Sequence, residues 1–153
     1  MIKELKKIIT SFFYIGYIPF APGTFGSLAA LFIYILIKDN FILLISFHIL
    51  ILILGFLLCR DASDLFNEPD SPRIVIDEVN GLFICFLALP RFTAATRGIL
   101  ILITGFIIYR ILDIIKPYPA NRLQRLNSSL GIMADDIIAA IYTNIILRIV
   151  LFF

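Results

Sequence analysis

The chain has 153 residues, of which 61% are hydrophobic and only 16% are charged, and its mean hydropathy is +1.02. Soluble domains are typically about half apolar and about a quarter charged, so this composition excludes an ordinary soluble domain and indicates a membrane protein. The net charge of +2 and the lack of a basic run interleaved with aromatic residues argue against a nucleic-acid partner. The length fits a single domain of a few membrane spans over residues 1–153.

Residues 1–18 carry three lysines within the first seven positions, followed by a short apolar run. We expect an interfacial amphipathic helix here, with the lysines turned toward anionic lipid headgroups. Pro19 and Pro22 then predict a turn through PFAPGTFGS, after which Thr24 can cap the next helix. A helix N-terminus offers free amide protons, which suits phosphate, although an ordinary cap is the simpler interpretation of this stretch alone.

Five apolar runs follow the turn, at residues 28–37, 41–59, 74–89, 98–108 and 132–153. The nineteen-residue run at 41–59 contains one histidine and no formal charge, so it is long enough to span a bilayer. The first run is short for a span, so it either tilts across the membrane or re-enters it. We therefore predict an all-α, multi-pass helical membrane protein.

The charged residues favour one side of this membrane domain. If every run crosses, the segments 1–24, 60–78 and 110–136 share a side. Nine of the thirteen basic residues and ten of the eleven acidic residues then lie on that side. The positive-inside rule makes it cytoplasmic, so we expect a site at the cytoplasmic membrane face.

Two adjacent acids, Asp77 and Glu78, begin the apolar run at 74–89. Acids at a membrane border are costly and are functional candidates by default. Magnesium prefers several oxygen ligands, which carboxylates from different segments supply. The alternative is a pair of structural salt bridges to Arg60 or Arg73.

A second group of charges ends the run at 98–108. Arg110, Asp113 and Lys116 are spaced by three, so they share one face if the segment is helical. Pro117 and Pro119 should end that helix, because proline lacks an amide proton and disfavours a helical residue before it. The basic side chains are candidates for clamping phosphoryl oxygens.

A third group, Asp135 and Asp136, stands at the start of the last apolar run. Unpaired, these carboxylates repel each other and resist desolvation, so a cation or a proton is expected nearby. Clustered carboxylates beside Arg and Lys indicate a divalent metal and an anionic group such as phosphate. A plain belt of interfacial charges is the alternative. Cys59, Cys85 and His48 lie in or beside apolar runs and are interpreted as packing residues.

Together these blocks resemble the phosphatidylglycerophosphatase A family of bacterial membrane lipid phosphatases. The matching residues are PFAPGTFGSLAA at 19–30, Asp70 with IVIDEVNG at 74–81, YRILDIIKPYP at 109–119 and GIMADDIIAA at 131–140. Leu112 and Ala140 depart from the family pattern, which usually has an aromatic residue and a glycine there.

The resemblance implies magnesium-dependent hydrolysis of the terminal phosphate of phosphatidylglycerophosphate, giving phosphatidylglycerol, at the bacterial inner membrane. The substrate is then a membrane phospholipid and the cofactor Mg²⁺. Carried onto this chain, the expected roles are catalysis by Asp77, Asp113 and Asp136, metal binding by Asp77, Glu78, Asp135 and Asp136, and phosphate binding by Thr24, Arg110 and Lys116. Whether water or a carboxylate attacks the phosphorus stays open at this point.

The competing hypothesis is a non-enzymatic ion-binding or transporter-type membrane subunit. In such a protein, acids should be spread along helices at mid-membrane depth, lining a path for the ion. The acids of this chain instead gather at one predicted face.

Overall fold

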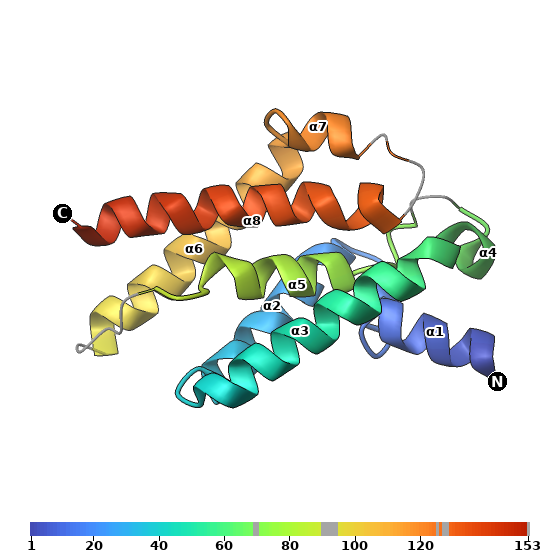
Figure 1. Ribbon diagram of the computed structural model, residues 1–153, viewed down its shortest axis with the longest axis horizontal. Helices are drawn as coiled ribbons and strands as arrows, with labels where there is room; N and C mark the ends of the chain where they lie inside the picture. The colour runs from blue at the N-terminus through green and yellow to red at the C-terminus, as the bar shows by residue number, and fades with distance from the viewer. Residues whose placement is uncertain (69–70, 90–94, 125, 127–128, 153) are drawn as a thin grey trace.

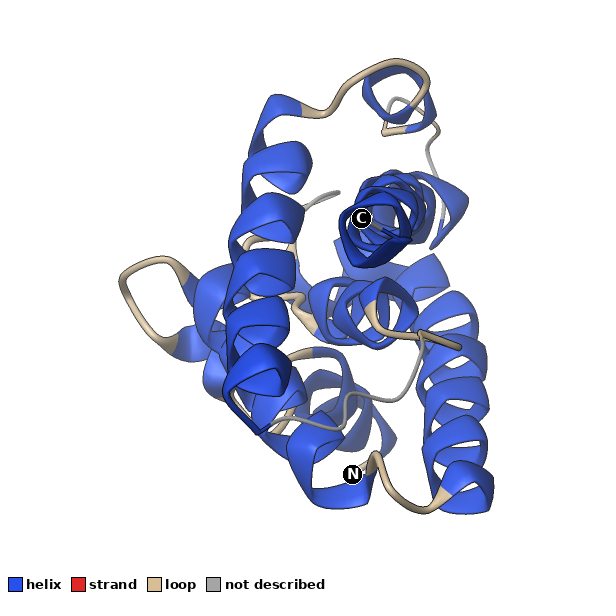
Figure 2. Cartoon of the chain, turned by 90° about the vertical axis from the view of Figure 1, so that its left-hand side faces the viewer, coloured by secondary structure: helices blue, strands red, loops and turns tan. Residues whose placement is uncertain are grey.

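The computed structural model describes residues 1–68, 71–89, 95–124, 126 and 129–152, and within these residues it contains helices and no strands (Figures 1 and 2). Three helices are long and apolar enough to cross a membrane: α3 (Phe41–Leu58), α6 (Ala95–Ile115) and α8 (Ser129–Phe152). A fourth apolar helix, α2 (Pro22–Ile37), is shorter. The all-α, multi-pass prediction is thereby confirmed. Asp70 and most of the turn expected at 90–97 lie outside the described residues.

Helix α2 begins earlier than the hydropathy pattern predicts. Its N-cap is Ala21, in the left-handed region at φ 46°, and Pro22 is its first helical residue. Proline is suited to this position because its φ is already helical and its missing amide proton has no partner to lose. The expected turn therefore ends at Ala21, and the prediction that Thr24 caps the helix is wrong. At the other end, the Asn40 side chain caps α3 by accepting a hydrogen bond from the Leu43 amide at 3.1 Å.

The short helix α5 (Ile76–Cys85) lies at the centre of the bundle, in contact with α2, α3, α6 and α8. Ten residues rise about 15 Å, half of the roughly 30 Å hydrocarbon layer. The prediction that the run 74–89 crosses as one helix is therefore wrong. Most of α5 is buried, so its surroundings are protein and its ends can be irregular without facing lipid.

Helices α5 and α8 run side by side in the same direction, and small residues between helices permit close contact (Figure 1). Ala139 and Ala140 of α8 are fully buried. On α6, a Cβ added at Gly105 would lie 2.5 Å from Phe86 and 2.9 Å from Leu147. These contacts are too tight for a larger side chain, so α6, α8 and the end of α5 form one packed unit.

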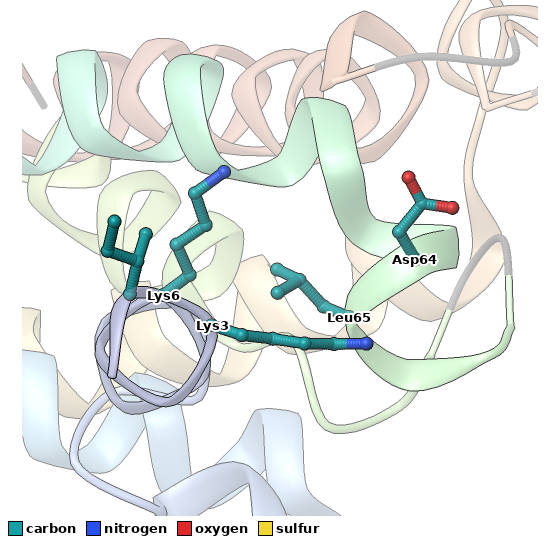
Figure 3. A pocket seen from close by; sticks show the side chains of 5 residues that line it. Lys3, Lys6, Asp64 and Leu65 are labelled. Atoms are coloured by element: carbon teal, nitrogen blue, oxygen red, sulfur yellow. The ribbon is translucent and has the colours of Figure 1, made fainter.

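The first helix, α1 (Ile2–Thr10), is shorter than the expected 1–18 element and is followed by a left-handed turn at residues 12–14. The Thr10 carbonyl accepts the Val75 amide at 3.0 Å, which fastens α1 to the residue before α5. Lys3 and Lys6 of α1 line a pocket with Asp64 and Leu65 of α4 (Ala62–Phe66), as Figure 3 shows.

Candidate active site

Three acids from two helices meet at one end of the bundle. Asp77 and Glu78 occupy the first turn of α5, and Asp136 lies on the facing side of α8. One carboxylate oxygen from each lies within 4.8 Å of the others, which is close enough for a shared metal ion. The helix dipole favours acids in the first turn of α5, and the parallel packing of α5 on α8 delivers the third.

These carboxylates have too little positive charge around them. Burial raises the pKa of Asp77 well above its usual range, and the neighbouring Glu78 charge raises it further. Burial also raises the pKa of Glu78, although a hydrogen bond with Asp77 opposes the change. Both shifts report the cost of desolvated anions, which a cation placed between the carboxylates would remove.

Arg110 connects α6 to α2 and to the acids. Its Nη1 donates to Asp113 Oδ2 at 2.9 Å and to Ser27 Oγ at 3.3 Å. The fully buried Ser27 hydroxyl in turn donates to the Gly23 carbonyl at 2.9 Å. Asp113 also lies within hydrogen-bonding reach of Asp136. The spacing of Arg110 and Asp113 in the sequence predicted that they share one helix face, and the structure pairs them. The hydrogen bond from Arg110 to Ser27 was not predicted, because the only indication of a role for Ser27 was its place in the PGTFGS block.

The N-terminus of α2 approaches this site at a glycine. A Cβ added at Gly23 would lie 2.0 Å from Glu78 Oε1 and 3.3 Å from Arg110 Nη2, so only glycine allows the contact. Thr24 follows it directly and is half-buried, and its amide donates to the Ala21 carbonyl at 3.0 Å. The residue of α2 that lies closest to Glu78 is thus Gly23, one position before Thr24, which the sequence had suggested for phosphate binding.

The last two charged residues form a separate pair. Lys116 follows the end of α6 in the left-handed conformation, and its Nζ donates to Asp135 Oδ2. Burial alone would lower the pKa of Lys116, but the hydrogen bond and charge of Asp135 raise it above its ordinary value. Asp135 therefore faces Lys116 while Asp136 faces α5, because successive helical residues point about 100° apart.

Three buried polar atoms of this site have no hydrogen-bond partner among the described residues: Glu78 Oε2, Arg110 Nε and Asp135 Oδ1. Buried polar groups are nearly always paired, so each such atom needs an explanation. Two of them are carboxylate oxygens, which suit a hard divalent cation such as Mg²⁺, and one is a guanidinium donor, which suits an anion. The residues present thus fit a metal ion together with a phosphate group.

The fold and the site define a class of protein: a helical membrane bundle that gathers carboxylates, an arginine and a lysine at one end. The family model for phosphatidylglycerophosphatase A matches residues 8–151, and the chain belongs to this family.

Two relatives of this chain carry the family's name, and a third carries another name. The phosphatidylglycerophosphatase A of Escherichia coli is 36% identical over 128 residues, covering 82% of this chain and 72% of the relative. That of Haemophilus influenzae is 33% identical over 134 residues, covering 86% and 79%. A Bacteroides thetaiotaomicron protein named "Putative phosphatidylinositol-3-phosphatase" is 30% identical over 151 residues, covering 95% of this chain and 92% of the relative. No solved structure matches the chain.

The buried ion pair gives a prediction about stability. Lys116→Met should leave the Asp135 carboxylate, which is 4% exposed, without its cation. Breaking a fully buried pair costs about 3–5 kcal/mol, and the partial exposure of Lys116 reduces this to about 2–3 kcal/mol. Lys38→Met is the matched control, because Lys38 pairs with the exposed Asp39 and should cost at most about 1 kcal/mol. Thermal unfolding of purified protein in detergent measures both; equal midpoints would contradict the assigned pair.

Proposed function

We propose that this chain hydrolyses the terminal phosphate monoester of phosphatidylglycerophosphate to phosphatidylglycerol, with Mg²⁺ as cofactor. Membership of the phosphatidylglycerophosphatase A family supports the reaction. The observation that carries the metal and phosphate roles is the convergence of Asp77, Glu78 and Asp136 beside Arg110, with unpaired atoms of both charges.

In this proposal Asp77, Glu78 and Asp136 would hold the metal, which would supply polarisation of a phosphoryl oxygen and neutralisation of developing charge. Asp135 contributes through Lys116, with which it is paired. This pairing keeps the ammonium charged and aimed at the site. The other oxygen of Asp135, Oδ1, has no partner among the described residues, so Asp135 stays in the expected ligand set through that atom.

Arg110 would bind phosphoryl oxygens through its planar guanidinium, which can donate two parallel hydrogen bonds to a phosphate. Asp113 and Ser27 fix that guanidinium before substrate arrives, which lowers the cost of ordering it. The Gly23 amide, at the start of α2, can add a donor at a helix N-terminus. These groups replace the expected role of Thr24.

The overall reaction consumes one water. The phosphorus–oxygen bond to the glycerol carbon chain breaks, the water oxygen is retained in inorganic phosphate, and a proton passes to the glycerol oxygen. Asp113 reaches both Arg110 and Asp136, so it is placed to orient the attacking water or to relay that proton. Charge that develops on the phosphoryl oxygens would be met by donors already in position.

The name of the Bacteroides thetaiotaomicron relative suggests a second candidate substrate. A 30% identical protein named for phosphatidylinositol 3-phosphate makes that lipid a second candidate. Both lipids present a phosphate monoester on an anionic glycerophospholipid headgroup, so the same residues would bind either. Selectivity would come from the groups around the alcohol that leaves.

The first prediction of this proposal concerns substrate and metal. Purified protein in mixed micelles should release phosphate from phosphatidylglycerophosphate, stop in excess chelator and recover with Mg²⁺. Ca²⁺ should substitute poorly, because it prefers looser and higher coordination. Phosphatidylinositol 3-phosphate is assayed in parallel, and the higher kcat/KM identifies the substrate. Undiminished turnover in chelator would remove the metal from the proposal, and no release from either lipid would remove the reaction.

The second prediction separates the site from surface charge. Asp136→Asn keeps the shape of the side chain but deletes one carboxylate of the cluster, so phosphate release should fall by roughly a hundred- to a thousand-fold. Asp64→Asn is the control, since Asp64 is an exposed residue of the pocket beneath α1 and should change the rate little. Rates are compared at matched protein level and saturating Mg²⁺. Near-full activity in both variants would contradict the assignment of Asp136.

The third prediction concerns the membrane side. The contact of Asp77 and Glu78 with Asp136 brings the starts of α5 and α8 to the same side of the membrane. We place this acid cluster at the cytoplasmic face of the bacterial inner membrane, because most of the basic residues belong to the charged segments on that side. In intact cells, an impermeant thiol reagent should label Asp39→Cys, in the exposed turn between α2 and α3. Asn121→Cys, on the exposed face of α7 (Ala120–Leu123), should react only after permeabilisation. The two native cysteines are buried. The reverse labelling pattern would place the site on the outer face.

A further inference from the structure

The C-terminal end of α5 lies inside the bundle, where its carbonyl groups need donors. The last carbonyls of any helix have no partner within that helix, and lipid offers none. The side chain of Asn144, on α8, supplies them. Its Nδ2 group donates to the carbonyls of Ile84, Cys85 and Leu87 at 3.1, 2.9 and 3.0 Å.

Arg148 completes this cap one helical turn further along α8. Its Nε donates to Asn144 Oδ1 at 2.7 Å, which turns the amide nitrogen of Asn144 toward α5. Its Nη2 donates to the carbonyls of Leu87 and Ala88 at 3.2 and 2.9 Å. Two adjacent side chains of one helix thus satisfy four carbonyls at the end of another.

The spacing of this cap matches the spacing of the acids. Along α5, Asp77 and Cys85 are eight residues apart; along α8, Asp136 and Asn144 are also eight residues apart. Eight helical residues rise about 12 Å, and because the helices run in the same direction, the two pairs of contacts lie at equal separations. The acids meet at one end of the helix pair and the amide cap closes the other.

We infer that Asn144, oriented by Arg148, is a positioning residue that fixes the axial register of α5 on α8 and thereby the mutual placement of the three site carboxylates. The small side chain of Ala140 is fully buried on α8, and Asn144, one helical turn further, adds a directional contact with α5 that opposes sliding. A slip of one residue moves Asp77 and Glu78 by about 1.5 Å relative to Asp136. Misplacement of about 1 Å in a catalytic site can lower a rate by roughly a hundredfold.

The same substitution at two asparagines tests this. Asn144→Asp keeps shape and can still pair with Arg148, but it removes the amide that donates to α5. Asn40→Asp is the matched control, because Asn40 caps α3 by accepting a hydrogen bond, which a carboxylate does equally well. Both variants lose a side-chain NH2 group, but the capping contact depends on that group as donor at Asn144 and on the side-chain oxygen as acceptor at Asn40.

Two readouts are taken on purified protein in detergent. The first, without substrate, is the shift in thermal unfolding midpoint as Mg²⁺ is added. The second is phosphate release as a function of Mg²⁺ concentration, which rests on the proposed function. For Asn144→Asp we expect the Mg²⁺ concentration at half-effect to rise about 10- to 100-fold in both readouts, the range seen when residues that orient metal ligands are lost. Asn40→Asp should match the parent protein.

Arg148→Lys is the milder companion variant. Lysine keeps the charge, but its three N–H donors are all on one nitrogen, so it cannot replace both the Nε contact with Asn144 and the Nη2 contacts with the carbonyls of Leu87 and Ala88. The half-effect concentration should therefore rise about tenfold or less. Unchanged Mg²⁺ titrations in a folded Asn144→Asp protein would overturn the inference. So would failure of both variants to fold, since the pair would then maintain the fold and not the register. A parent protein that binds Mg²⁺ but releases no phosphate would overturn the proposed reaction alone.

Discussion

The ten-residue helix α5 imposes the constraint on which the remaining architecture depends. It is too short to cross the membrane layer, yet it lies at the centre of the bundle, so both of its ends must be satisfied by protein. At its first turn the free amides favour the acids that form the site, and at its last turn Asn144 supplies the missing donors.

Electrostatics explains why the cations of the site are already paired. Arg110 and Lys116 would be costly to leave alone in this partly buried region, so Asp113 and Asp135 neutralise them. That pairing leaves Asp77, Glu78 and Asp136 without matched charge. Under the proposed function, a divalent cation would balance this remaining group, and a bound phosphate would then balance the metal and the guanidinium. The arrangement thus separates structural ion pairs from carboxylates available to a ligand.

Much of this could be predicted from the sequence, because hydropathy and charge are local properties. The spanning helices, the end of α6 before Pro117 and the Arg110–Asp113 pair all follow from short-range patterns. The length of α5 could not be predicted, because apolar residues continue past Cys85 and only contacts with α8 show that the helix has ended. Asn144 looked like a mere interruption of an apolar run for the same reason.

The different orientations of Asp135 and Asp136 bear on the transporter hypothesis. A path for ions requires polar groups in succession through the membrane, and the DD pair could have begun one. Asp135 turns aside to Lys116, and beyond the acids lie Leu82 and Phe83 of α5 and its C-cap Phe86, each at most 2% exposed. The polar side chains of Asn80 and Thr143 are fully buried between the acids and the Asn144 amide, which is engaged with backbone carbonyls. Buried and mainly apolar side chains therefore fill the bundle behind the acids. This arrangement suits a site that a lipid headgroup enters and leaves from one face.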